Sequence, residues 1–210
     1  METVSNTNDK LIKNFCLGIG FALLAAAMAA MPFSGGFKGL LYGWREILIS
    51  PCPLITDYFG IGGVASTFFN GAVCSLTCML ITILCRARTT PSFLAAYMLL
   101  VAHCFYGMNF LNIWPCYIGV IFYYLFKKKD FRDHLHIAMF SMAFGPLVSE
   151  MLFRYTPEDM YIPGEVHLTI PGIVLTIVVG LAAGIALPGM LEGALWMHKG
   201  YNLYNGGLAF

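Results

Sequence analysis

The stretch "GIGGVASTFFNGAVCSLTCMLITILC" (Gly60–Cys85) decides the fold, because it runs for 26 residues without an Asp, Glu, Lys or Arg. A helix of roughly 20 apolar residues crosses the hydrocarbon core of a bilayer, so this stretch is long enough to span a membrane. Five further apolar segments of the same kind accompany it: Ile12–Met31, Pro91–Gly107, Ile113–Phe126, Leu135–Phe153 and Leu168–Leu191. The pattern predicts an all-α, polytopic membrane protein with about six transmembrane helices.

The composition points to the same class. The chain is 59% hydrophobic and 11% charged, whereas about 25% of residues are charged in an average soluble domain. A soluble protein could not cover its surface with so few charges, so we expect the lipid bilayer to be its main partner. The formal net charge of +1 gives no indication of a nucleic-acid partner.

The interval between the first two segments, Pro32 to Asp57, predicts an amphipathic helix lying in the membrane interface. "SPCP" (Ser50–Pro53) ends it. Two helical faces can be distinguished, one apolar and one polar: Phe37, Leu40, Leu41, Trp44 and Leu48, against Lys38, Tyr42 and Arg45.

The distribution of basic residues orients the helices. If all six segments cross, nine basic residues lie on one side and three on the other: Lys10, Lys13, Arg86, Arg88, Lys127, Lys128, Lys129, Arg132 and Lys199, against Lys38, Arg45 and Arg154. By the positive-inside rule the nine are cytoplasmic, as is the N-terminus, in a cell (plasma) membrane. The first segment is alternatively a signal peptide, with "AMA" (Ala27–Ala29) as its cleavage site. Its length favours an uncleaved helix.

Polar and Gly-rich positions inside the spans are the candidate functional residues, because a polar group in a bilayer is costly unless it is paired or solvated. Gly60, Gly62 and Gly63 permit a broken or re-entrant helix of the kind that binds substrates in transporters. Ordinary packing of small residues is the alternative. Asn70 falls within the same span.

A second group of polar residues is centred on His103, whose imidazole either meets a backbone carbonyl or takes part in a proton relay. Asn109 and Asn112 are expected to cap and turn the chain before Trp114. We expect Asn70 and His103 to approach a common water-accessible cavity, since a position facing lipid would leave both unsatisfied.

The last two segments carry the remaining candidates. Gly145–Pro146 predicts a kink in the fifth. Glu150 and Arg154 stand four apart and can form an ion pair. Glu192, at the end of the sixth segment, faces either a cavity or the interface.

No catalytic or metal-binding motif is recognisable in the chain. GxSxG, HExxH, P-loop and dinucleotide-binding patterns are all missing, so we predict no cofactor. Cys74 and Cys78 share a helical face that could hold a soft metal. All seven cysteines are nevertheless better explained as small apolar side chains packed between helices.

Three stretches carry a resemblance to a known family: "GLLYGWREILISPCPLITDYFGIGGVASTFFNGA" (39–72), "FYGMNFLNIWPCYIGV" (105–120) and "HKGYNLYNGGLAF" (198–210). They resemble a bacterial multi-pass family catalogued as domain of unknown function 1576, over roughly Gly39 to Phe210. Family members are about twice as long, so the resemblance implies that residues 1–210 are one membrane domain, the N-terminal half of a longer protein. It implies no substrate, reaction, cofactor or site residue.

A short internal echo also suggests duplication. "FFNGAV" (Phe68–Val73) and "LYNGGL" (Leu203–Leu208) share a pattern that places Asn205 in correspondence with Asn70. A missing C-terminal half is therefore an expected partner.

Three functions remain open. The first is a secondary transporter for a small solute, whose path is formed by the candidates named above: Asn70, His103, Gly60, Gly62, Gly63, Glu150, Glu192 and Asn205. The second is a membrane-embedded enzyme acting on a lipid or isoprenoid intermediate, with His103, Glu150 and Glu192 as its only acid or base candidates. The third is a membrane scaffold. We expect transport and assign no catalytic residue, since fold class alone does not determine function.

Overall fold

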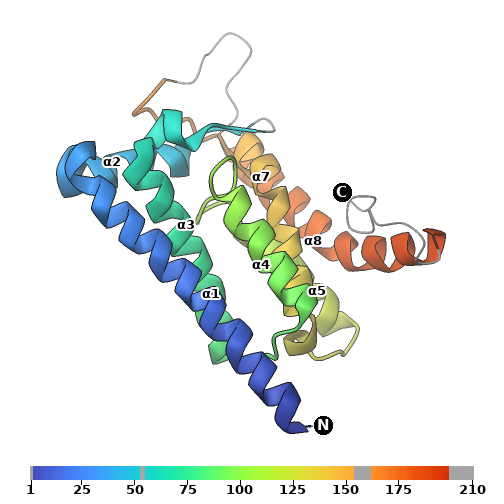
Figure 1. Ribbon diagram of the computed structural model, residues 1–210. Coiled ribbons are helices and arrows are strands. Elements are labelled where there is room, and N and C mark those ends of the chain that lie inside the picture. The colour runs from blue at the N-terminus through green and yellow to red at the C-terminus, as the bar shows by residue number, and fades with distance from the viewer. Residues whose placement is uncertain (1, 53–54, 154–161, 199–210) are drawn as a thin grey trace.

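The computed structural model describes residues 2–52, 55–153 and 162–198. Within these ranges the chain forms helices and no strand, which confirms the all-α prediction (Figure 1). Eight α-helices and three 3-10 turns follow one another along the described chain: α1 Glu2–Ala30, η1 Met31–Ser34, α2 Gly36–Ile49, α3 Tyr58–Leu84, α4 Pro91–His103, α5 Trp114–Phe126, η2 Phe131–His134, α6 Leu135–Ser141, η3 Met142–Phe144, α7 Gly145–Leu152 and α8 Ile170–His198.

The chain reverses direction between successive passages through the bundle, which are α1, α3, α4, α5, the α6–α7 pair and α8 (Figure 1). Four stretches are long and apolar enough to cross a membrane: Asn8–Ser34, Tyr58–Leu84, Phe131–Leu152 and Ile170–Gly193. The other two, α4 and α5, have 13 residues each. At 1.5 Å per residue each covers about 20 Å, short of the roughly 30 Å hydrocarbon core. The helix expected to continue to Gly107 ends at His103, so irregular backbone completes this passage.

Close contacts at glycines hold two pairs of neighbouring helices together, α5 with α8 and α1 with α3. A side chain at Gly119 on α5 would clash with the carbonyl oxygen of Leu181 on α8. A side chain at Gly184 on α8 would clash with the carbonyl oxygen of Cys116 on α5. On α1, a Cβ at Gly20 would lie 2.6 Å from Leu76 Cδ2 of α3. Small residues therefore set the spacing of both pairs, as is usual for helices packed in lipid.

Helix α2 forms as predicted, but its buried face differs from the expected one. Phe37 and Leu41 of the apolar stripe are 63% and 41% exposed, whereas Leu40 and Gly43 are buried against α3. Gly43 touches the backbone of Gly62, so a side chain there would clash. Of the apolar stripe, Phe37 and Leu41 therefore point away from the protein, whereas Leu40 faces α3. Beside a membrane, lipid is a favourable environment for exposed apolar side chains.

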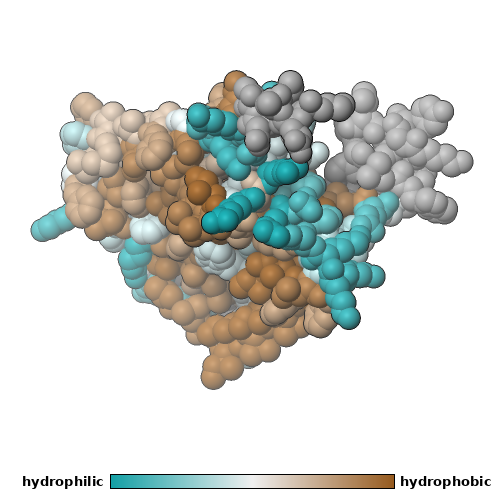
Figure 2. Space-filling view, turned by 90° about the horizontal axis from the view of Figure 1, so that it is seen from below, coloured by the Kyte–Doolittle hydropathy of each residue, from teal (hydrophilic) through white to brown (hydrophobic). Residues whose placement is uncertain are grey.

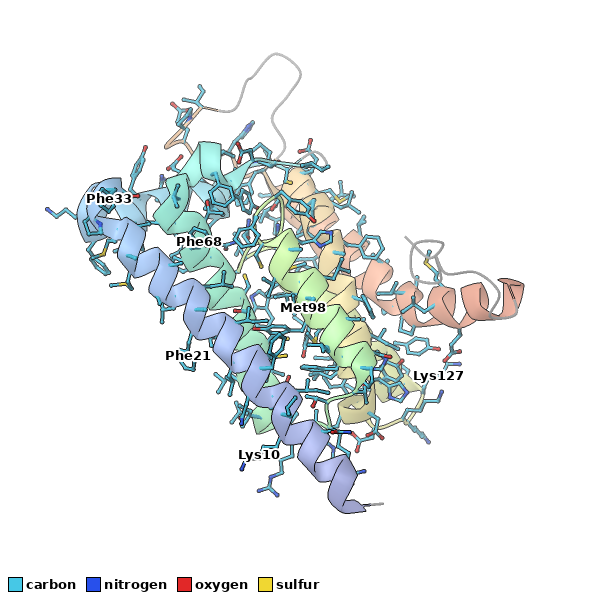
Figure 3. The ribbon with its side chains drawn as sticks, viewed as in Figure 1. Lys10, Phe21, Phe33, Phe68, Met98 and Lys127 are labelled. Carbon is cyan, nitrogen blue, oxygen red and sulfur yellow. The ribbon has the colours of Figure 1, made fainter. Side chains whose placement is uncertain are left out.

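The basic residues gather at one end of the bundle. Lys10 and Lys127 lie toward this end, whereas Phe33 lies at the other (Figure 3). The Asp9 carboxylate accepts hydrogen bonds from the backbone N–H and the hydroxyl of Thr89, which ties α1 to the turn between α3 and α4. Seen from below, hydrophilic side chains collect on this face and apolar ones surround them (Figure 2). We call it the basic end.

Candidate functional site: a junction of interrupted helices

The first interruption lies in α3 at Gly63, whose backbone angles are φ 76° and ψ 173°. Only glycine adopts this conformation without strain. The hydroxyl of Thr67 donates to the Gly63 carbonyl at 2.8 Å, and Asp57 caps the start of the helix by accepting from the Phe59 N–H. The predicted break in the glycine-rich stretch is therefore present, and it separates the first turn of α3 from the rest.

The second interruption is the irregular segment 104–113 between α4 and α5. Cys104, Met108 and Asn109 are 0–1% exposed. Asn70, at the middle of α3, donates its two amide hydrogens to the carbonyls of Cys104 and Met108 at 3.0 and 2.9 Å. The segment thus reaches the depth of the middle of a candidate span. Irregular backbone is tolerated at such depth only inside protein or beside a water-filled cavity.

The third interruption separates α6 from α7. The helix stops at Ser141, continues as a 3-10 turn and resumes at Gly145–Pro146, which confirms the predicted kink. This break packs on the segment 104–113. A Cβ at Gly145 would lie 2.6 Å from Asn112 Oδ1, and one at Gly107 would lie 2.8 Å from Pro146 Cγ. The start of α3, which the break at Gly63 separates from the rest of the helix, also contacts segment 104–113, because the Tyr58 N–H donates to Phe105 O at 3.3 Å. We call the region formed by the start of α3, segment 104–113 and the α6–α7 break the helix-break junction.

Amide side chains connect the helix-break junction internally. Asn109 Oδ1 accepts from the backbone N–H groups of Leu111 and Asn112, and its Nδ2 donates to Ile47 O and to the Tyr58 hydroxyl. Asn112 donates to Gly107 O and to Ser149 Oγ, both at 2.8 Å, and accepts from Asn109 N–H. The two asparagines turn the chain as predicted. They also bind it to α2, α3 and α7, which the sequence pattern did not reveal.

A buried carboxylate on α2 was missed by sequence reasoning. Glu46 is 2% exposed and pairs with Arg45 at 2.7 Å. The Gly164 N–H donates to Glu46 Oε2 at 2.6 Å, and Arg45 donates to the Gly164 carbonyl at 3.0 Å. Together they hold the segment before α8 against α2. The only sign of this buried carboxylate in the sequence is that Glu46 directly follows Arg45 of the predicted polar face.

Five of the predicted site residues lie on α3 or α4. Gly62 contacts α2, Gly63 forms the break, and Gly60 is exposed beside Asp57. His103 is half-buried, with Nδ1 2.8 Å from Leu99 O, and directly precedes the Cys104 carbonyl that Asn70 binds. Asn70 therefore contacts the residue that follows His103 in the chain, while the His103 imidazole lies against Leu99 O. A shared water-accessible cavity stays a prediction.

The remaining candidates are dispersed. Glu150 is half-buried on α7, within electrostatic range of Cys52. Glu192 is exposed on α8, within range of Tyr124. Asn205 and the expected partner of Glu150, Arg154, lie outside the described residues. No group of His, Cys, Asp and Glu suited to a metal ion occurs in the described part of the chain, and the seven thiols are free.

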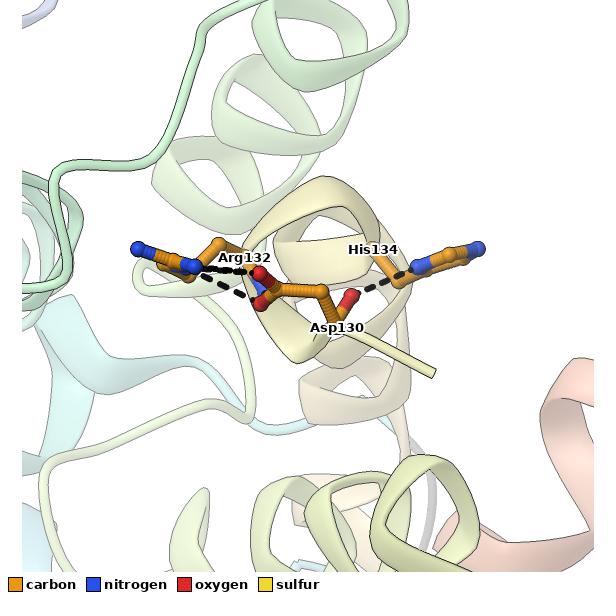
Figure 4. A network of polar contacts seen from close by, with 3 residues as sticks. All are labelled: Asp130, Arg132 and His134. Atoms are coloured by element: carbon orange, nitrogen blue, oxygen red, sulfur yellow. Dashed lines mark hydrogen bonds and ion pairs between the residues drawn. The ribbon is translucent and has the colours of Figure 1, made fainter. Parts of the chain in front are cut away.

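A compact charged turn lies at the basic end, after α5 (Figure 4). The Arg132 Nε donates to both carboxylate oxygens of Asp130, and His134 Nδ1 lies 3.0 Å from the Asp130 carbonyl. The bond from the Arg132 guanidinium lowers the pKa of Asp130 to about 2. Both side chains are exposed, so the pair shapes the turn and adds little stability.

A family model described as "Protein of unknown function (DUF1576)" matches residues 36–210. No curated protein and no solved structure matches the chain.

Proposed function

We propose that this chain, which belongs to the DUF1576 family, is a secondary transporter of a small solute. The family description assigns no function, so the proposal rests on the helix-break junction. One observation supports the proposal: three helix interruptions, at Gly63, at segment 104–113 and at Gly145, border one region of the bundle. Interrupted helices supply free N–H and C=O groups where transporters bind their substrates.

The chemistry of the helix-break junction favours an uncharged or zwitterionic solute. Its buried polar side chains are mainly amides and hydroxyls, as in Asn70, Asn109, Asn112 and Ser149. These groups both donate and accept hydrogen bonds and carry no charge. In the described conformation the amide hydrogens of Asn70 are engaged by backbone carbonyls. Under this proposal Asn70 exchanges those carbonyls for solute when segment 104–113 moves.

The proposed orientation places the basic end in the cytoplasm and the helix-break junction toward the outside. Gly63 is the proposed hinge, since its backbone can change conformation without a side-chain penalty. Helix α2 covers this hinge through the contact between Gly43 and Gly62, and the Ser66 hydroxyl donates to Leu40 O at 2.9 Å. Movement of α2 would therefore move the first turn of α3.

Uptake by proteoliposomes tests the proposal. The full chain is reconstituted and offered a panel of labelled amino acids, polyols and nucleosides, with and without a proton or sodium gradient. At least one solute should accumulate faster than in empty liposomes. Gly63→Ala should abolish that uptake, because a side chain is strained at φ 76°.

The matched control is Gly18→Ala in α1, where an added Cβ meets nothing within 4 Å. Gly18→Ala should retain uptake, and size-exclusion chromatography should show both variants folded. If the unmodified protein moves every solute no faster than empty liposomes do, the transport proposal is wrong.

A further inference from the structure

Two buried tyrosines on α5 have hydroxyl groups without a hydrogen-bond partner among the described residues. Tyr117 is 3% exposed and Tyr124 is 1% exposed. They stand seven residues apart, so they lie two turns apart on one face of the helix. Val120, between them on the same face, is fully buried.

The fold otherwise satisfies its deeply buried phenols. The Tyr97 hydroxyl donates to Cys16 O at 2.6 Å, and the Tyr58 hydroxyl accepts from Asn109 Nδ2 at 3.1 Å. All four tyrosines are at most 3% exposed. The two pairs of tyrosines therefore differ in the hydrogen bonding of their hydroxyl groups and not in their burial. Tyr58 and Tyr97 can thus serve as internal controls.

The ring contacts of Tyr117 and Tyr124 place the two side chains between the core and the basic end. The Tyr117 ring packs edge-on against Trp114 and Phe131. The Tyr124 ring stacks on His134, with ring centroids 4.1 Å apart, and its hydroxyl is within electrostatic range of Glu192. His134 belongs to the charged turn, so Tyr124 lies beside the basic end of the bundle.

We propose that the hydroxyls of Tyr117 and Tyr124 bind ordered water molecules in an internal hydrated site beside α5. A buried hydroxyl without a partner costs free energy that a phenylalanine at the same position would avoid. Internal waters usually satisfy such groups. A phenol is a neutral donor and acceptor, so water suits it without an added charge.

The proposal does not depend on transport. It concerns α5, whereas the helix-break junction lies where α3, segment 104–113 and α7 meet. If the protein does carry a solute, the waters would form the cytoplasmic part of the route. If it does not, the hydrated site stands as a property of the bundle.

Hydroxyl-radical labelling tests the hydrated site. The full chain in lipid nanodiscs is exposed to X-rays, which generate radicals from bound as well as bulk water, and oxidation of each tyrosine is measured by mass spectrometry. Tyr117 and Tyr124 should be oxidised several-fold faster than Tyr58 and Tyr97. Equal, slow oxidation of all four would overturn the proposal, since the residue type and the burial are matched.

Removal of each hydroxyl gives a second readout. Tyr97→Phe loses a bond to a backbone carbonyl and should lower the melting temperature by about 2–4 °C. Tyr117→Phe and Tyr124→Phe should leave it unchanged, and oxidation at the substituted position should fall to the level of Tyr97. A drop in melting temperature equal to that of Tyr97→Phe would reveal a protein partner for the hydroxyl and overturn the proposal.

Discussion

At the scale of single residues, uncharged side chains make most of the side-chain hydrogen bonds inside the bundle. Asn70, Asn109 and Asn112 each join backbone groups that no helix satisfies. Ser66 likewise bonds to the Leu40 carbonyl. An amide or hydroxyl can satisfy such groups without the cost of burying a charge, which is severe in a membrane.

Asn112→Ala should destabilise the protein strongly. It leaves Gly107 O, Ser149 Oγ and Asn109 N–H without the partner shown in the structure. Each unsatisfied buried group costs about 1–3 kcal/mol, so a loss of about 3 kcal/mol in the free energy of unfolding is expected. Chemical unfolding in detergent measures it.

The control for this substitution is Asn14→Ala, at an exposed position on α1. It should change the free energy of unfolding by less than about 0.5 kcal/mol. Equal effects of the two substitutions would mean that the Asn112 network does not hold the helix-break junction.

At the scale of helices, sequence patterns place most elements and two of their breaks, at Gly63 and at Gly145, but miss the end of α4 and the buried face of α2. The predicted Gly60–Cys85 and Ile113–Phe126 correspond closely to α3 and α5. The end of α4 at His103 was not predictable from hydropathy, because the residues that follow it are also largely apolar. Tertiary hydrogen bonds from the Asn70 side chain and from the backbone N–H groups of Thr56 and Tyr58 hold them in a non-helical conformation. The buried face of α2 depends in the same way on its contact with Gly62.

Gly184→Ala should separate α5 from α8. The added methyl group would clash with the Cys116 carbonyl, and neither backbone can move without parting the helices. Overpacking of this kind costs about 1–3 kcal/mol or more. Thermal unfolding followed by tryptophan fluorescence measures the loss.

Gly189→Ala serves as the control on the same helix, because a Cβ there meets nothing within 4 Å. Higher helix propensity makes it neutral or stabilising by up to about 1 kcal/mol. A Gly184→Ala protein as stable as Gly189→Ala would contradict the close packing of α5 on α8.

At the scale of the whole molecule, the two ends of the bundle differ in chemistry. One end carries Lys10, Lys127 and the charged turn at Asp130. The other carries α2 and the exposed Phe33, and the helix breaks lie on its side of the bundle. Charge counting predicted the gathering of the basic residues. It did not predict that the interruptions meet, because their contacts join segments far apart in the chain.

The central claim is that the helix-break junction faces the outside while the basic end faces the cytoplasm. Single cysteines at Leu111, which is 43% exposed, and at Lys128, which is also exposed, test it directly. Cys85→Ser is a suitable background, because the other six native thiols are buried. In intact cells a membrane-impermeant maleimide should label Leu111→Cys, and it should label Lys128→Cys only after permeabilisation. Labelling of Lys128→Cys in intact cells, with Leu111→Cys protected, would contradict the claim.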